Sequence, residues 1–396
     1  MSRRILTCIA IAAIAFGAPS TLSPAKGARI DVTADALLAA VYDEIVRGHL
    51  DVALQNLDGL IRIKPNFRLA HLIKGDLLLA RARPISTIGA VPNVPEARIE
   101  GLRAEALARL RAYRDPPPTD RVPRYLLQLR NDQKYAVVVD TQRSRLYVYR
   151  NDHGEPHFVD DYYVSSGKNG ALKVREGDEK TPIGVYHVTG SLPRKKLSDF
   201  YGSGAFPINY PNEWDRIRGR DGHGIWLHGT PSDTYSRPPR SSNGCVVLAN
   251  PDLDALARIL QVGLTPVIIS EEVELLSFDD WASERKAFGK QLEQWRADWE
   301  SLDTERYLSH YSKKFSAQGQ DFEAWGRHKR LVNSGKSWIK VKVSNISMLR
   351  DPGKEDLVLV SFDQEYRSSN LSNTVKKRQY WIHEDGRWRI VYEGTG

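Results

Sequence analysis

Apolar residues recur every three or four positions through residues 33–82, the spacing of helices that bury one face. Three helices are predicted there: one around 37–45, a second over 50–63, and a third over 69–82. Prolines follow the second and third, which is typical of helix ends. A further helix is expected near 95–113, before a run of three prolines that marks a plausible linker.

Three residues in this helical region fall at offsets that resemble the tetratricopeptide repeat, a pattern of helix pairs. They are Ala53, Pro65 and Gly75. The range holds too little sequence for a full stack, and a short stack needs neighbours to bury its face. We therefore expect a TPR-like helical region over residues 30–130, linker included, that contacts a partner protein or the next domain; a plain helical cap is the alternative.

From Lys134 the hydrophobic period changes to two, which predicts strands. One helix is expected at 253–261. The pattern as a whole predicts a mostly-β domain over residues 133–272. Its strands are expected at 135–139, 145–149, 162–165, 184–189, 225–228 and 264–269.

The last part of the chain begins with a long amphipathic helix after Glu274, with a shorter helix at 307–315. Alternating strands then follow, and Asp385-Gly386 is a hairpin turn signal. Helices before an antiparallel sheet describe an α+β cone over 276–396 whose layout resembles the nuclear transport factor 2-like (NTF2-like) fold. Trp338, Tyr366, Tyr380 and Trp388 could line a pocket in the cone, with core packing as the alternative. The strands are expected at 338–346, 357–362, 375–382 and 387–392.

Composition indicates a folded protein of two or three domains: the chain has 396 residues, 41% hydrophobic and 27% charged. The formal net charge is +8 and the sequence pI is about 9.3. The basic residues are scattered and form no nucleic-acid motif, so we expect no nucleic-acid partner. The charge is compatible with a polyanionic cell envelope.

The N-terminus has the pattern of a secretory signal peptide over residues 1–25. Arg3 and Arg4 precede an apolar run over 5–18, and Ser23-Pro24-Ala25 offers a cleavage site. The run is shorter than the roughly 20 residues that span a bilayer, although an uncleaved anchor is the alternative. We therefore expect an exported, periplasmic protein.

Removal of this peptide takes Cys8 with it, which leaves Cys245 as the sole cysteine of the mature chain. A disulfide within one chain is then excluded. A lone thiol in an oxidising compartment is either buried as a small hydrophobe or used chemically.

The chemistry concentrates in two segments, 222–230 and 240–248. His228 ends a predicted strand, and Cys245 follows a polar loop. A thiol needs a base to become a nucleophilic thiolate. Gly244 lets the backbone approach a substrate closely and can aim amides at an oxyanion, while the carbonyl of Gly229 can orient the imidazole.

These residues resemble the L,D-transpeptidase catalytic domain, also called the YkuD domain, over roughly residues 133–270. His228-Gly229 and Ser242-Asn243-Gly244-Cys245 match its motifs, and Lys180–Gly184 resembles its Thr-Pro-x-Gly segment. Two departures are Asn243, where many members have histidine, and Val247, where many have arginine or asparagine. They favour a branch of exported proteobacterial enzymes with a C-terminal NTF2-like domain, in which transpeptidase and carboxypeptidase activities are both implied.

The resemblance implies an acyl transfer on peptidoglycan stem peptides. Cys245 attacks the third residue of a tetrapeptide stem, and His228, held by the Gly229 carbonyl, carries the proton to the departing D-alanine. The Gly244 and Cys245 amides, next to Asn243, stabilise the oxyanion. An amine then resolves the thioester to a cross-link, or water resolves it to a tripeptide. No metal or organic cofactor is needed.

Four further residues are candidate substrate contacts: Ser242, Arg240, Trp226 and Tyr210. Arg240 could bind a stem carboxylate, or be a solvated loop residue; Trp226 and Tyr210 could line the groove, or pack in the core.

Three readings compete with an L,D-transpeptidase. The first is an L,D-carboxypeptidase, which shares the acyl-enzyme. The second is a zinc site built from His223, His228 and Cys245, whose spacing matches no zinc pattern. The third is a non-catalytic protein that docks an envelope partner through its helical or C-terminal domain. The favoured interpretation is a multidomain chain: helical TPR-like region, mostly-β catalytic domain and NTF2-like cone.

Overall fold

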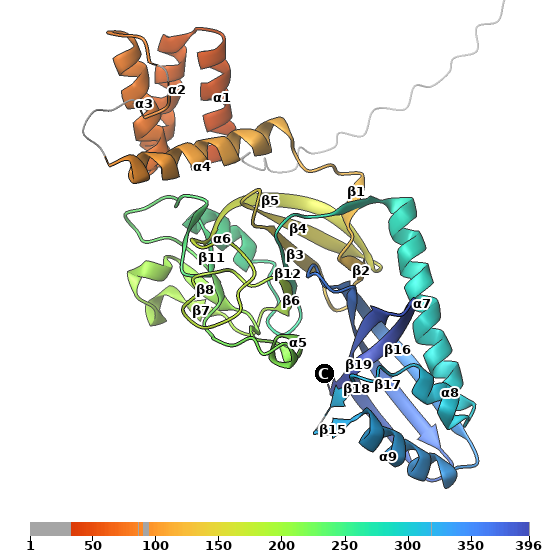
Figure 1. Ribbon diagram of the computed structural model, residues 1–396. Coiled ribbons are helices and arrows are strands. Elements are labelled where there is room, and N and C mark those ends of the chain that lie inside the picture. The colour runs from red at the N-terminus through yellow and green to blue at the C-terminus, as the bar shows by residue number, and fades with distance from the viewer. Residues whose placement is uncertain (1–32, 86, 90–94, 318, 396) are drawn as a thin grey trace, which may run out of the picture. The chain divides into compact units, whose positions relative to one another are not determined.

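The computed structural model describes residues 33–85, 87–89, 95–317 and 319–395 (Figure 1). The expected signal peptide at 1–25 lies outside the described residues. Ala34–Gly396 form one compact unit. In the described part of the chain, no helix combines the length and apolarity that crossing a membrane requires.

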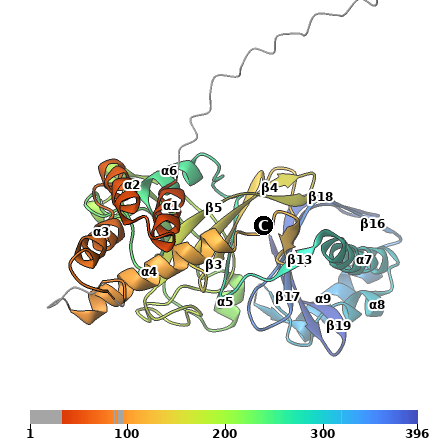
Figure 2. The same ribbon diagram turned by 90° about the horizontal axis from the view of Figure 1, so that it is seen from above.

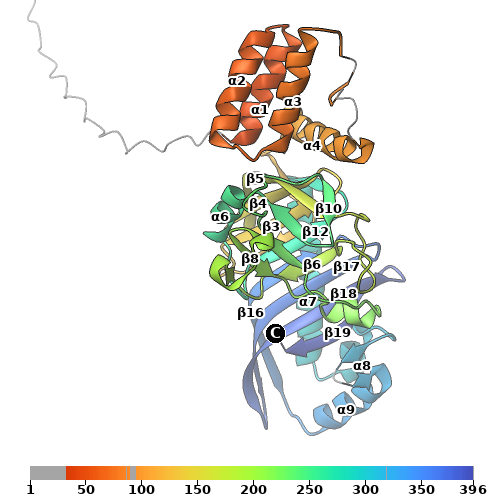
Figure 3. The same ribbon diagram turned by 90° about the vertical axis from the view of Figure 1, so that its left-hand side faces the viewer.

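The N-terminal region is helical, as predicted. Helices α1 (Ala34–Val46), α2 (Leu50–Ile63) and α3 (Arg68–Ala80) lie side by side (Figures 1, 2 and 3). Helix α4 (Glu96–Arg114) contacts α1 and α3. Their apolar faces form one core, and the tetratricopeptide character stays a prediction. The largest side chains of this core are Leu38, Leu57, Leu60, Phe67 and Leu69.

The middle of the chain folds around a ten-stranded sheet with the order β6-β12-β3-β4-β5-β11-β9-β8-β7, and β10 pairs with β5. The short strands β7, β8, β10 and β11 were not predicted, because two to four residues show too little alternation to detect. Two short helices, α5 (Glu213–Ile217) and α6 (Asn250–Ala257), complete the domain. The strands are β3 (Tyr135–Asp140), β4 (Arg145–Asp152), β5 (Glu155–Gly167), β6 (Gly184–His187), β7 (Leu192–Pro193), β8 (Gly204–Pro207), β9 (Trp226–His228), β10 (Arg240–Ser242), β11 (Val246–Leu248) and β12 (Pro266–Ser270).

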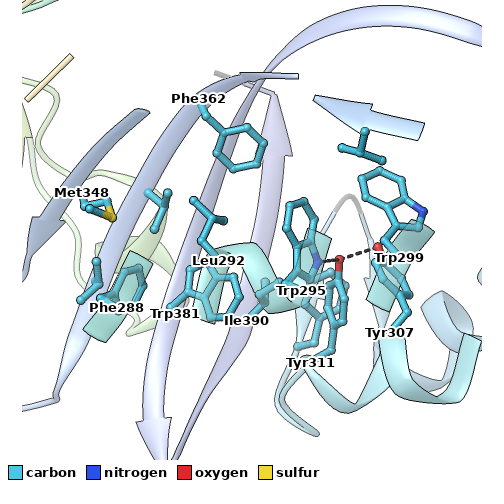
Figure 4. Packing of buried hydrophobic residues seen from close by; sticks show 14 of the residues in the cluster. Phe288, Leu292, Trp295, Trp299, Tyr307, Tyr311, Met348, Phe362, Trp381 and Ile390 are labelled. Atoms are coloured by element: carbon cyan, nitrogen blue, oxygen red, sulfur yellow. Dashed lines mark hydrogen bonds between the residues drawn. The ribbon is translucent and has the colours of Figure 1, made fainter. Parts of the chain in front are cut away.

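The C-terminal domain packs α7 (Phe278–Glu300) and two shorter helices against a five-stranded antiparallel sheet. An aromatic core fills the space between them, and in it Trp295 donates to the Tyr311 hydroxyl (Figure 4). The hairpin prediction at Asp385-Gly386 is confirmed, because both residues have positive φ. The remaining elements are α8 (Thr304–Ser309), β14 (Ser316–Ala317), β15 (Gln320–Asp321), α9 (Phe322–Ser334), β16 (Ile339–Arg350), β17 (Leu357–Ser368), β18 (Ser372–Glu384) and β19 (Arg387–Thr395).

The stretch expected to be a linker contains two strands. Strand β2 (Leu126–Gln128) pairs with β16 at the edge of the C-terminal sheet, and the Trp281 indole donates to the Leu126 carbonyl over 2.7 Å. Strand β1 (Arg121–Pro123) pairs with β13 (Leu275–Ser277). These strands have only three residues, and their partners lie far along the chain. The sequence around them therefore shows no periodicity from which they could be predicted.

Two other expectations in the C-terminal domain need correction. The helix expected at 307–315 is the shorter α8, and helix α9 was not predicted. Of the four aromatics considered for a pocket, Tyr366 and Tyr380 are buried in agreement with the core-packing alternative, and Trp388 packs on Phe288 with ring centroids 5.1 Å apart.

Candidate active site

Two short neighbouring strands carry the predicted base and precede the predicted nucleophile. Strands β9 and β11 are parallel neighbours, with Leu227 opposite Val246 and His228 opposite Val247. Leu227 and Val246 point into the hydrophobic core. Because side chains alternate along a strand, His228 projects from the other face. Cys245 immediately precedes β11, two positions before the Val247 that lies opposite His228.

His228 is held as a neutral base. Its Nδ1 lies 2.7 Å from the carbonyl oxygen of Gly229. A carbonyl only accepts, so Nδ1 carries the proton and Nε2 of the neutral ring keeps its lone pair. Burial of the imidazole lowers the pKa of His228 to about 4, and the nearby positive charge of Arg237 acts in the same direction.

The Cys245 thiol is also held in its neutral form. Burial raises the pKa of Cys245, while a hydrogen bond from the Trp226 backbone and the charges of Arg237 and Lys173 act against that rise. The sulfur donates to the carbonyl of Gly224 over 3.4 Å. Among the described residues, no hydrogen bond joins the thiol to His228. Burial of both groups therefore disfavours a preformed thiolate–imidazolium pair.

The turn that presents Cys245 is built from backbone contacts. Gly244 has φ +123°, and a Cβ there would lie 2.7 Å from the Lys180 carbonyl oxygen, so only glycine fits. The Ser242 hydroxyl accepts from the Gly244 amide (3.1 Å) and donates to the Cys245 carbonyl (2.6 Å). Thr181 donates to the Gly244 carbonyl over 3.0 Å.

These bonds correct two expectations. The Gly244 amide is already used by Ser242, so it does not point at a substrate oxyanion in this structure. The Ser242 hydroxyl is buried and spends both of its hydrogen bonds inside the turn, so it shapes the loop instead of contacting substrate.

Comparison with known proteins places this site in a family. Residues 134–269 match the L,D-transpeptidase catalytic domain (YkuD), and residues 287–394 match the Cds6 C-terminal NTF2-like domain. Bd1075 of Bdellovibrio bacteriovorus is 30% identical in sequence, with a TM-score of 0.63; the alignment covers 70% of this chain and 98% of Bd1075. The chain belongs to the L,D-transpeptidase family, in its branch with a C-terminal NTF2-like domain.

A second solved structure is also similar to this chain. The helical cell shape determining protein Pgp2 of Campylobacter jejuni is 28% identical, with a TM-score of 0.58. The match covers 68% of this chain and 95% of Pgp2. No curated protein matched the chain.

One side chain that sequence reasoning missed fixes the loop beside His228. The Asn250 amide oxygen accepts from the Ser203 (2.9 Å) and Thr230 (3.2 Å) backbone, and its nitrogen donates to the Thr230 carbonyl (2.9 Å). A Cβ on Gly229 would lie 2.1 Å from that same oxygen. Asn250 therefore requires glycine after His228. No local pattern marks this role.

The surroundings of the candidate site are aromatic. The ring centroids of Tyr201 and Trp226 lie 4.9 Å apart, and those of Tyr201 and His228 lie 5.1 Å apart. Phe200, 48% exposed, lies 5.8 Å from the His228 ring. Trp226 is only partly buried and stays a candidate substrate contact, while the sequence singled out neither Phe200 nor Tyr201.

Three other sequence candidates lie differently. Tyr210 is a buried core residue whose hydroxyl donates to the Asp221 carbonyl over 2.9 Å, which agrees with the core-packing alternative and not with a place in the groove. Arg240 is exposed on β10 opposite Ser166. Asn243 is exposed in the turn beside Cys245.

The zinc alternative finds no support in the geometry. The imidazole of His223 is 80% exposed and lies 3.6 Å from a Glu176 carboxylate oxygen. Within the described ranges, no three His, Cys, Asp or Glu side chains gather so that they could hold a metal ion. A cavity of about 650 Å³ lies elsewhere, between α4 and β4, and does not include Cys245.

Proposed function

We propose that this protein is a peptidoglycan L,D-transpeptidase with Cys245 as its nucleophile and the tetrapeptide stem as its acyl donor. The observation that carries the proposal is the hydrogen bond of His228 Nδ1 to the Gly229 carbonyl, on the strand next to Cys245. It leaves Nε2 free to take a proton, which is the requirement for a general base at this position.

In the first half-reaction, the thiol turns from the Gly224 carbonyl towards His228 and gives up its proton to Nε2 as it attacks. The sulfur bonds to the carbonyl carbon of the third stem residue. The tetrahedral intermediate then collapses, the bond to the D-alanine nitrogen breaks, and His228 returns the proton to that nitrogen. The Cys245 amide, beside Asn243, is the proposed oxyanion donor.

In the second half-reaction, His228 takes a proton from the incoming nucleophile, which attacks the thioester carbonyl carbon. The carbon–sulfur bond then breaks, and His228 gives the proton to the departing sulfur, which restores the thiol. An amine from a neighbouring stem gives a cross-link, whereas water gives a tripeptide. The departures at Asn243 and Val247 favour the branch in which hydrolysis is also implied, so L,D-carboxypeptidase activity is the second candidate.

Mass spectrometry of muropeptides tests both candidates. The purified protein is incubated with tetrapeptide-containing muropeptides, and the products and free D-alanine are measured. New cross-linked dimers support transfer, and tripeptides without dimers support hydrolysis. Cys245→Ala should abolish both products, while release of D-alanine that survives this change, or no release by the wild type, would overturn the proposal.

The proposed substrate lies outside the cytoplasm, so the proposal includes export to the periplasm through the signal peptide at 1–25. Cell fractionation with N-terminal sequencing tests it. The mature chain should be found in the periplasmic fraction and begin close after Ala25; an intact Met1 in the cytoplasm would contradict it.

A further inference from the structure

One basic side chain stacks on an aromatic ring that neighbours the predicted base. The positive charge of Arg237 acts on both Cys245 and His228. Its guanidinium lies 4.6 Å from the centre of the Phe200 ring, whose own centroid is 5.8 Å from His228. Arg237 is only partly buried, so a ligand at the surface beside Phe200 can reach it.

Arg237 differs from the other cation near the thiol. Lys173 is buried and already paired with the Asp178 carboxylate, with Nζ 2.8 Å from Oδ1. No carboxylate of the described residues forms an ion pair with Arg237. Its guanidinium is therefore a charged donor beside the reacting groups, with its hydrogen bonds to oxygen still to be made.

The backbone around Arg237 is anchored, which limits the positions that its side chain can reach. The hydroxyl of Tyr163 donates to the Arg237 carbonyl over 2.9 Å, and the Ser166 amide donates to the Pro239 carbonyl over 2.8 Å. Arg237 also precedes Pro238, which restricts it to extended backbone. Pre-organisation of this kind reduces the entropy lost on binding.

We propose that Arg237 binds the terminal carboxylate of the tetrapeptide stem, the carboxylate of the departing D-alanine. The assignment rests on the proposed function. The leaving nitrogen must lie within hydrogen-bond reach of His228 to receive its proton. The D-alanine carboxylate carbon is two bonds from that nitrogen, and Arg237 is the unpaired cation beside His228.

A guanidinium matches a carboxylate with two parallel hydrogen bonds. Phe200 beneath it forms a flat apolar surface that holds the guanidinium plane. The role that the sequence suggested for Arg240 thereby passes to Arg237. Arg237 is a binding residue that makes the protein specific for a free C-terminal D-amino acid.

The test measures binding separately from chemistry. In a Cys245→Ala background, calorimetry compares the tetrapeptide stem with its C-terminal amide, which lacks the charge. We expect the acid to bind about 10- to 100-fold more tightly than the amide, the range of a charge-assisted contact. Adding Arg237→Gln should remove this preference, and Arg237→Lys should restore part of it.

Kinetics with the thiol intact complete the test. Arg237→Gln should raise KM for the acid more than it lowers kcat, whereas Arg258→Gln, the same charge loss on an exposed residue at the end of α6, should leave both values unchanged. A preference that persists in Arg237→Gln, or that disappears in Arg240→Gln instead, would overturn the assignment. If the wild type releases D-alanine but does not prefer the acid to the amide, only the assignment of Arg237 is overturned. If the wild type releases no D-alanine, the proposed function is overturned as well.

Discussion

The hydroxyl of Thr181 donates to the carbonyl of Gly244, 3.0 Å away, and so ties the segment before β6 to the residue before the proposed nucleophile. The same hydroxyl accepts from the Gly167 amide over 2.8 Å. Thr181 is fully buried. One side chain therefore joins the end of β5, the segment before β6 and the Cys245 turn.

Replacing Thr181 by valine should impair both stability and activity. Valine keeps the shape but leaves the Gly167 amide and the Gly244 carbonyl without this partner, a cost of about 1–3 kcal/mol. A displaced turn should lower kcat/KM for the tetrapeptide by about 10- to 100-fold. Thermal unfolding and D-alanine release measure the two effects. Thr181→Ser keeps the hydroxyl and should retain most activity; equal loss in both variants would contradict the role.

Alanine at position 229 should disturb the imidazole without touching it. The new methyl group would lie 2.1 Å from the Asn250 amide oxygen, so the Gly229 carbonyl or the Asn250 clamp must move. Either movement loosens the bond that orients His228, and we expect kcat to fall by about 10- to 100-fold. Steady-state kinetics measure it.

Gly59→Ala is the matched control for that change. Gly59 lies in α2, and nothing lies within 4 Å of a Cβ placed there. Activity should be unchanged, and the helix should gain roughly 0.5–1 kcal/mol of stability. If Gly229→Ala were as active as this control, Gly229 would have no orienting role.

As the pH is lowered, kcat/KM should begin to fall only at an unusually low pH. Catalysis needs His228 unprotonated, and burial lowers its pKa to about 4 from the usual value of roughly 6.5. Protonation, and with it the loss of activity, should therefore set in only as pH falls towards 4. D-alanine release between pH 3.5 and 8 measures this acid limb. An acid limb near 6.5 would mean that the imidazole is far easier to charge.

The rate of alkylation by iodoacetamide should report the protonation of the Cys245 thiol, separately from that of His228. Burial raises the pKa of Cys245 above its usual range, so the thiolate is scarce at neutral pH. The alkylation rate should keep rising with pH beyond about 8.5. A rate that is already at its plateau at pH 7 would indicate a thiolate–imidazolium pair at rest.

Arg109 should be important for the stability of the helical region and of the loop that carries Arg237. Its guanidinium is 4% exposed, pairs with Asp35 and Glu105, and lies 4.0 Å from the Tyr163 ring centre. Arg109→Met leaves two carboxylates without this partner, one of them fully buried, and should cost about 3–5 kcal/mol. Denaturant unfolding measures it, and exposed Arg114→Met should change stability by less than about 0.5 kcal/mol.

The sequence predicted those parts of the fold and site that are local. The long helices and strands were found because their periodicity extends over many residues, as in α2 and β3. The orienting carbonyl was predictable because Gly229 directly follows His228. His228 and Cys245 were identified from a local sequence pattern, so their prediction did not depend on tertiary contacts.

The remaining features depend on contacts between distant segments. Asn250 acts on the loop after His228 from the start of α6, and Arg237 differs from Arg240 only in what the folded loop places around it. The sequence predicted that the Gly244 amide would donate to an oxyanion, but the folded turn uses this amide in a hydrogen bond to Ser242. Residue type and spacing do not encode which hydrogen bonds are already taken.

Strand β2 has a consequence for how the protein is made. Leu126 and Leu127 are fully buried in the finished molecule, and their strand pairs with β16. A ribosome adds about 5–20 residues per second, so β2 leaves it on the order of 10–45 s before β16 has been synthesised. During that interval Leu126 and Leu127 have no native partner strand. The catalytic domain, which lies between β2 and β16 in the sequence, can be complete while the C-terminal sheet still lacks its other four strands. Cutting the gene after the catalytic domain would make this transient exposure permanent.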